Sequence, residues 1–159
     1  MSSLRPSIKL VAAVIIHCAL ISTSAYAAEA EVKMLNKGSD GGVMVFEPAL
    51  VHVAAGGSVH FVATDKSHNV ESIPGMSPDG AQPFTGGMNQ DLVVKLDKPG
   101  VYGYRCKPHY GMGMVGLIVV GKPVNEDAAK AAMASGMPNF AKSKLTKLFE
   151  EIDTKAGDK

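Results

Sequence analysis

The most informative stretch of this 159-residue chain is Cys106-Lys107-Pro108-His109-Tyr110-Gly111-Met112-Gly113-Met114. It places a thiol, an imidazole and two thioethers within nine positions. Soft sulfur donors together with imidazole suit copper among the common biological metals. The spacing Cys-x2-His-x4-Met is short enough for one tight turn to direct three side chains at a single ion. The stretch therefore predicts a site for one copper ion per chain.

Short apolar runs lie on both sides of this loop, and similar runs continue through residues 31–120. They are rich in β-branched and aromatic residues, and turn signals containing Gly or Pro separate them. Such a pattern is typical of a β-sandwich or barrel. The seven runs are Val32–Leu35, Val43–Phe46, Leu50–Val53, Val59–Ala63, Leu92–Leu96, Val101–Tyr104 and Val115–Val120. Residues 71–90 lack periodicity, and we expect them to form an ordered connection beside the site.

The end of the chain changes from a strand pattern to a helical one, expected over about residues 125–153. Asn125 can cap a first helix, and Gly136 can end it. Pro138 suits the first turn of a second helix. Apolar residues of the second helix recur at roughly helical spacing, and we expect them to pack against the strands. They are Phe140, Leu145, Leu148, Phe149 and Ile152.

The beginning of the chain, residues 1–27, has the layout of a secretory signal peptide. Arg5 and Lys9 give a positive start, and an apolar run of 12 residues follows from Leu10 to Ile21. Ala25-Tyr26-Ala27 is a small-x-small cleavage signal. The apolar run is too short to span a bilayer, which needs about 20 apolar residues. We therefore expect export, cleavage after Ala27, no membrane insertion, and one mature domain over residues 28–159.

Cleavage after Ala27 would remove Cys18 and leave Cys106 as a single cysteine. A lone cysteine cannot form an internal disulfide, so it is a buried spectator, an intermolecular link, a nucleophile or a metal ligand. Loss of Arg5 and Lys9 would lower the formal net charge from +1 to −1. Such a chain lacks the basic stripe of a nucleic-acid binder, and we expect no nucleic-acid partner.

A second histidine must come from elsewhere in the chain, and the best candidate is His68. It lies just past a strand run, where a sandwich presents ligands, and Asn69 beside it can hydrogen-bond across to the cysteine loop. His52 and His60 lie within strand runs, and we expect both to be partly exposed strand residues. Spacing alone leaves the role of His68 open.

Met112 and Met114 compete for an axial position. Met114 begins the next strand, whereas Met112 lies between two glycines and can form surface; for both, filling a gap in the core is the alternative.

Pro108 lacks an N–H, which fixes the turn and limits hydrogen bonds to the thiolate. Two imidazoles and a thiolate in a plane, with a weak axial thioether, make a blue-copper electron-transfer centre. No open coordination position and no general acid or base is evident, so we expect no enzymatic activity.

Four segments of the chain resemble the pseudoazurins, cupredoxins of the bacterial periplasm. They are Met34-Leu35-Asn36-Lys37-Gly38, Met44-Val45-Phe46-Glu47-Pro48, His68-Asn69-Val70-Glu71-Ser72 and Cys106 to Met114. The resemblance covers essentially the whole expected mature chain. It implies an all-β, cupredoxin-like Greek-key β-sandwich of about eight strands with two C-terminal α-helices. It also implies that the copper ligands are His68, Cys106, His109 and Met114.

The resemblance further implies a monomeric periplasmic electron carrier. Its acceptor would be a denitrification enzyme such as nitrite or nitrous oxide reductase, and its donor a cytochrome-type or quinol-linked protein. Such proteins dock through an apolar surface at the exposed histidine edge, which Pro108 and Met112 would form here, inside a ring of basic residues. Lys37, Lys66, Arg105 and Lys107 are the candidates for that ring.

One departure from the family pattern lies in the connection, where this chain has Phe84-Thr85-Gly86-Gly87-Met88 in place of the lysines that often follow the phenylalanine. This departure predicts a weaker basic ring. Two other functions stay open at this point. One is a copper carrier or store that hands over the metal itself, and the other is an enzyme with Cys106 as nucleophile.

Overall fold

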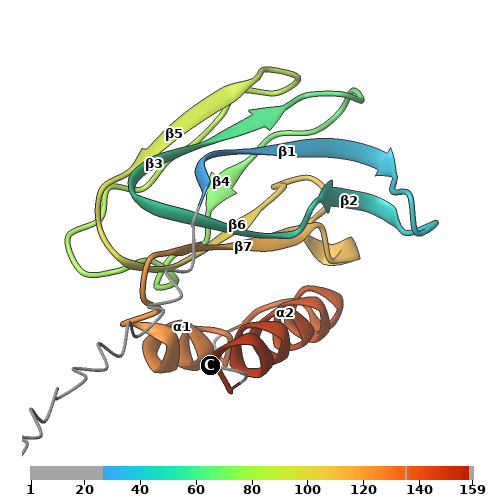
Figure 1. The fold of residues 1–159 in the computed structure, drawn as a ribbon. Helices are drawn as coiled ribbons and strands as arrows, with labels where there is room; N and C mark the ends of the chain where they lie inside the picture. The colour runs from blue at the N-terminus through green and yellow to red at the C-terminus, as the bar shows by residue number, and fades with distance from the viewer. Residues whose placement is uncertain (1–26, 135, 158–159) are drawn as a thin grey trace, which may run out of the picture.

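The computed structural model describes residues 27–134 and 136–157. Apart from Ala27, the predicted signal peptide therefore lies outside the described residues. Within the described part, seven strands precede two α-helices (Figure 1). The strands are β1 (Ala27–Lys37), β2 (Val43–Glu47), β3 (Leu50–Val62), β4 (Glu71–Ser72), β5 (Leu92–Leu96), β6 (Gly100–Arg105) and β7 (Val115–Val120). The helices are the 3-10 turn η1 (Tyr110–Met112), α1 (Glu126–Ala132) and α2 (Asn139–Gly157).

The strands pair in the order β2-β1-β3-β7-β6-β4, and β5 pairs with β3. The β1–β3 and β3–β7 pairs are parallel, whereas the other pairs are antiparallel. Figure 1 shows the strands folded into two layers, with α1 and α2 lying against the layer that contains β6 and β7. The predicted two-layered β-domain with C-terminal helices is therefore present.

Strand β3 corrects one detail of the predicted pattern, because Leu50–Val53 and Val59–Ala63 were expected to be separate strands. They form one strand of 13 residues. Its first part pairs with β7 and its last part with β5. Gly56, with a positive φ of 81°, lies between the two parts, and a glycine at this position lets the strand bend without ending.

The connection over residues 71–90 contains the short strand β4, which the sequence did not predict. Glu71 pairs with Arg105 and Ser72 with Tyr104, so the connection is attached to the strand that leads into Cys106. The Ser72 N–H also donates to the Phe84 carbonyl at 2.9 Å. The expectation of an ordered connection beside the site is confirmed by these contacts.

Two apolar cores lie on opposite faces of β6 and β7. Tyr102, Tyr104 and Ile118 point into the core between the strand layers, where Tyr104 packs edge-on against Phe46 and Phe61. The alternate positions of the same strands pack against the helices. Because both faces are covered, every residue of β7 is buried. No helix among the described residues is long and apolar enough to cross a membrane.

The apolar stripe of α2 is confirmed except at its first member. Leu145, Leu148, Phe149 and Ile152 are buried against the strands, but Phe140 is 72% exposed. The reason is the helical period, because Ala141 is the residue of the first turn that lies above Leu145 and faces the core.

Asn125 precedes α1 as predicted, but its side chain makes no capping hydrogen bond. Its Oδ1 accepts from the Val101 N–H at 2.6 Å, and its Nδ2 donates to the Val101 carbonyl at 3.0 Å. The side chain therefore joins the start of α1 to β6 and does not stabilise the helix end.

Candidate metal centre

The loop between β6 and β7 is held in shape by its own backbone. The Cys106 N–H donates to the Met114 carbonyl at 3.0 Å, and the Met114 N–H donates to the His109 carbonyl at 3.2 Å. The turn η1 begins directly after His109 and ends directly before Gly113, whose φ of 86° suits glycine. These backbone bonds fix the positions of Cys106, His109 and Met114 relative to one another.

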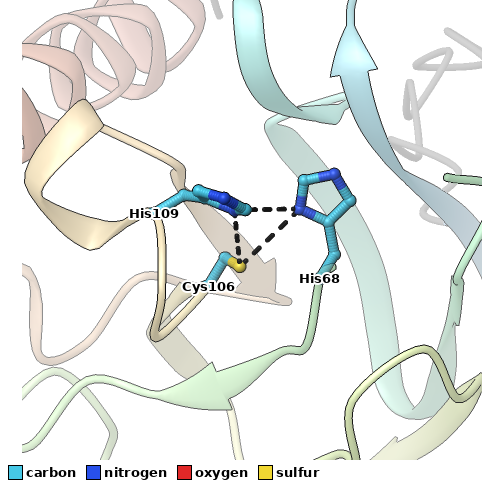
Figure 2. Close-up of side chains that lie close together, drawn as sticks. All are labelled: His68, Cys106 and His109. Carbon is cyan, nitrogen blue, oxygen red and sulfur yellow. Dashed lines mark hydrogen bonds between the residues drawn. The ribbon is translucent and has the colours of Figure 1, made fainter. Parts of the chain in front are cut away.

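His68 reaches this loop from the segment after β3. Its Nδ1 lies 3.8 Å from Cys106 Sγ and 3.2 Å from His109 Nδ1, and the His109 Nδ1 lies 3.5 Å from the same sulfur. Figure 2 shows the three side chains converging, with Cys106 and His109 on one loop and His68 on a separate segment. The group is the one cluster of histidine, cysteine and acidic side chains with metal-binding geometry among the described residues. The candidate that spacing alone left open therefore lies beside the other two.

Burial favours the uncharged forms of His68 and Cys106. His68 and Cys106 are both fully buried, and His109 is partly exposed. Burial, and then the neighbouring His109, lower the pKa of His68, with Asp65 opposing the shift. Burial raises the pKa of the Cys106 thiol, and the backbone N–H groups of Asn69 and His109 oppose this. A cation at the centre would reverse the preference of the thiol, because it favours the thiolate, and would reinforce the neutral form of His68.

Two asparagines orient the donors. Asn69 Oδ1 accepts from the Lys107 N–H at 2.8 Å, so the predicted hydrogen bond from Asn69 to the cysteine loop is present. Asn36, which the sequence did not single out, places its Oδ1 3.0 Å from His68 Nε2. An acceptor there favours the tautomer with the proton on Nε2, which leaves the Nδ1 lone pair aimed at the cluster. Asn36 lies 32 residues before His68. The sequence indicated it only as a member of Met34–Gly38, one of the four segments that resemble the pseudoazurins.

The two methionines of the loop have different surroundings. Met114 is fully buried and belongs to the same core cluster as Cys106. Met112 is 50% exposed. Met114 therefore lies on the inner side of the loop and Met112 on its surface, as expected from their positions in the sequence.

The residues predicted for docking are not equivalent in the structure. Lys37, Lys66 and Lys107 are exposed, as are Pro108 and Met112. Arg105 is different, because its Nη2 lies 2.7 Å from Glu71 Oε1 and its guanidinium lies 4.7 Å from the centre of the Tyr110 ring. These contacts occupy the Arg105 side chain within the molecule, where it supports the ligand loop.

The other histidines lie apart from the cluster. His60 is partly exposed on β3 and its Nε2 lies 3.7 Å from the Asp91 carboxylate. His52 is likewise partly exposed on β3. Both agree with the expectation of strand histidines, and His17 and Cys18 lie outside the described residues.

The donor set fits a copper ion. Three donors about 2.0–2.3 Å from one ion in a trigonal plane would lie about 3.5–3.8 Å from one another. The three observed separations of 3.2, 3.5 and 3.8 Å are close to this requirement. Two imidazoles and one thiolate in such an arrangement are ligands of a blue-copper centre, and Met114 supplies a thioether in the same buried cluster as Cys106.

Comparison with known proteins agrees with this chemistry. Residues 32–121 match the family of copper binding proteins described as plastocyanin/azurin. A pseudoazurin from Methylorubrum extorquens is 49% identical over 145 residues, which cover 90% of this chain and 95% of the relative. The chain belongs to the pseudoazurin family. A second pseudoazurin, from Paracoccus pantotrophus, is 45% identical over 84% of this chain and 90% of its own length.

A solved structure of a pseudoazurin has the same fold as this chain. The crystal structure of pseudoazurin from Methylobacterium extorquens superposes with a TM-score of 0.72 at 50% identity, covering 78% of this chain and 98% of the other. Fold class and cofactor are therefore those predicted from the sequence, with seven strands described where about eight were expected. Pseudoazurins are blue copper electron carriers, and copper is the cofactor of this family.

Proposed function

We propose that this pseudoazurin binds one copper ion through His68, Cys106, His109 and Met114 and carries single electrons in the bacterial periplasm. The observation that supports this most directly is the buried triangle of two Nδ1 atoms and one sulfur, with sides of 3.2–3.8 Å. Copper bound there would supply a one-electron Cu(I)/Cu(II) couple. Met114, buried on the inner side of the loop, is the proposed axial ligand.

The surrounding residues suit fast electron transfer because they allow little movement. Asn36 orients the His68 ring, Asn69 bonds the backbone of Lys107, and Pro108 removes one possible donor to the sulfur. Ligands held in this way change little in position when one electron is gained or lost. His109 is the partly exposed ligand, and we propose its outer edge as the route by which the electron leaves.

The buried donors also favour a carrier over an enzyme. His68 and Cys106 are both without exposed surface, so a substrate has no path to the sulfur or to that imidazole. We propose a monomer whose acceptor is a copper nitrite reductase or nitrous oxide reductase and whose donor is a cytochrome-type or quinol-linked protein. The exposed Pro108 and Met112 beside His109 support contact with such partners, and Lys37, Lys66 and Lys107 support an acidic one.

Copper loading tests the proposed ligands. The oxidised protein should show the intense visible absorption of a thiolate-to-copper transition, and Cys106→Ala should abolish it while circular dichroism shows a folded protein. His68→Gln should also lose the blue colour, whereas the matched variant His60→Gln should retain it. A colourless copper-loaded wild-type protein would rule the assignment out.

Chelator competition separates an electron carrier from a copper carrier or store. A carrier of electrons should retain its ion through repeated oxidation and reduction, because the buried ligands hinder release. Rapid transfer of copper to the chelator in both oxidation states would support the alternative function, in which the protein transports or stores copper.

Steady-state oxidation by a copper nitrite reductase tests the proposed acceptor. The reduced protein should be oxidised only when both reductase and nitrite are present. Replacing Lys37 and Lys66 with glutamate should slow the reaction at low ionic strength, since exposed charges are screened beyond about 10 Å at 0.1 M salt. Lys122→Glu, at the far end of β7, is the matched control. Equal rates for both variants would remove these two lysines from the docking account.

A further inference from the structure

Phe140 is the most exposed large apolar side chain among the described residues, with 72% of its surface accessible. It lies in the first turn of α2, but the face of α2 that packs against the strands begins at Ala141. The packing of the helix therefore does not explain an aromatic residue at this position. A single exposed apolar side chain is ordinary, so the meaning of Phe140 depends on whether it adjoins other exposed apolar surface.

The position of Phe140 is next to the metal-ligand loop. A Cβ atom built on Gly113 would lie 3.3 Å from the Phe140 Cβ and 3.1 Å from its carbonyl oxygen. The start of α2 therefore packs directly on the residue that follows η1, and Figure 1 shows this turn beside α2. Met112, in η1, is 50% exposed. The turn that carries the exposed Met112 therefore adjoins the start of α2, which carries the exposed Phe140.

The order of basic and acidic residues along α2 is the reverse of the order that the helix dipole favours. The positive end of the helix dipole lies at the N-terminus and favours acidic residues there. The first turn of α2 has none, and Lys142, Lys144 and Lys147 occupy its first half. The acidic residues Glu150, Glu151 and Asp153 follow in the second half. Helix stability does not account for this order, and sequences usually depart from a local rule of this kind at functional sites.

Lys144 and Lys147 share a helix face with Phe140, because they follow it by four and seven residues. Lys147 is exposed and Lys144 partly so. Neither residue takes part in any ion pair between described residues. One face of α2 therefore presents an aromatic ring next to the ligand loop, followed by two free positive charges.

We propose that Phe140, Lys144 and Lys147 form the second half of the docking surface and bind an acidic redox partner, which we take to be a copper nitrite reductase. Phe140 would enter the apolar centre of the interface beside Met112, and the lysines would face carboxylates at its rim. This inference rests on the proposed function, since it concerns the partner of the same site. It adds a helix that was not among the residues predicted for docking.

Chemical-shift mapping tests the location of the surface. The ¹⁵N-labelled, Cu(I)-loaded protein would be titrated with a copper nitrite reductase at low ionic strength. Perturbed amides over both residues 107–113 and 139–147 support the proposal. Changes confined to 107–113 overturn it and leave the proposed function intact, whereas no change at any amide overturns both.

Kinetics of the same reductase tests the energetic role of each part. Phe140→Ser should raise KM about fivefold to tenfold, as expected for loss of an aromatic anchor, with kcat nearly unchanged. Val124→Ser is the matched control, because Val124 is 71% exposed but lies past the far end of β7. The visible spectrum and reduction potential should be those of the wild type in both variants, since neither residue touches the donor atoms.

The lysines are tested by the double variant Lys144→Glu/Lys147→Glu. It should lower kcat/KM at low salt by more than Lys122→Glu does, and the difference should shrink as salt is added. Wild-type KM for Phe140→Ser, or equal salt dependence for the double variant and the Lys122 control, would show that α2 stands outside the interface.

Discussion

At the scale of single residues, the site depends on how His68 is held. Its Nδ1 faces the Cys106 sulfur, and its Nε2 lies 3.0 Å from Asn36 Oδ1. The asparagine therefore controls both the tautomer and the orientation of the ring. Outer hydrogen bonds of this kind affect metal affinity although they never touch the metal.

Asn36→Ala is expected to weaken copper binding by about 10- to 100-fold, because the His68 ring loses the acceptor that orients it. Competition with a chelator of known affinity measures the change. The Asn36 backbone N–H bond to Asp65 is kept in this variant, so the strand end should stay in place. Gln82→Ala, in an exposed loop, is the control. If Asn36→Ala binds copper as tightly as the wild type, contacts other than the one with Asn36 orient the His68 ring.

The metal-free protein is expected to be most stable between about pH 6.5 and 9.0. The pKa of His68 is lowered from 6.5, so below that pH the unfolded chain takes up a proton that the folded chain refuses. The pKa of Cys106 is raised from 9.0, so above that pH the unfolded chain releases a proton that the folded chain retains. Both effects lower the free energy of unfolding outside this window.

Urea unfolding of the metal-free protein from pH 5 to 10 measures this dependence. Cys106→Ser should remove the alkaline decrease that belongs to the thiol and leave the acidic one. If the alkaline decrease is as large in Cys106→Ser as in the wild type, other groups cause it.

At the scale of secondary structure, one side chain that the local sequence pattern predicts to cap a helix instead connects that helix to a strand. Asn125 stands at the expected N-cap of α1, yet both of its polar groups bond the backbone of Val101 in β6. Val101 is fully buried and is the second residue of β6, the strand that leads to Cys106. A residue that appears to serve one helix therefore anchors the strand that carries the thiol.

Asn125→Ala is expected to lower the free energy of unfolding by about 1–3 kcal/mol, because it leaves the N–H and carbonyl of buried Val101 without these partners. Asn125→Asp keeps an acceptor for the N–H and loses the donor, so its effect should be smaller. Denaturant unfolding of the copper-free proteins gives both values. Equal stability of wild type and Asn125→Ala would mean that water replaces the side chain at no cost.

At the scale of the whole molecule, the two helices form part of the core that supports the strands. Leu145 and Phe149 pack with Leu117 and Val119 on the outer face of β7. The opposite face of β7 helps to enclose the core that contains Cys106 and Met114. The helices therefore stabilise the layer on which the ligand loop is built.

Leu145→Ala is expected to cost about 2–5 kcal/mol, as for other fully buried leucines, and to leave the blue spectrum unchanged in the folded protein. Thr146→Ala, at the exposed neighbouring position, should change stability by much less. Thermal unfolding and visible absorption measure the two properties separately. A Leu145→Ala protein as stable as the Thr146 control would show that α2 contributes little to the core.

The amino-acid sequence by itself determined the chemistry of the site and the class of the fold. Cys106, His109 and Met114 lie within nine residues, and one turn closed by local backbone hydrogen bonds brings them together. Strand pattern and turn signals likewise act over a few residues, so the β-domain and the two helices could be predicted. The resemblance of four segments to the pseudoazurins then predicted His68 as a ligand, whereas spacing alone had left the role of His68 open.

Only the tertiary structure decided which distant groups meet. The approach of His68 to Cys106, the bond from Asn36, and the pairing of Arg105 with Glu71 all depend on how separate strands align. The exposure of Phe140 depends on the rotation of α2 about its own axis against β7. Periodicity within one segment carries no information about strand register or helix rotation, because the packing of whole elements sets both.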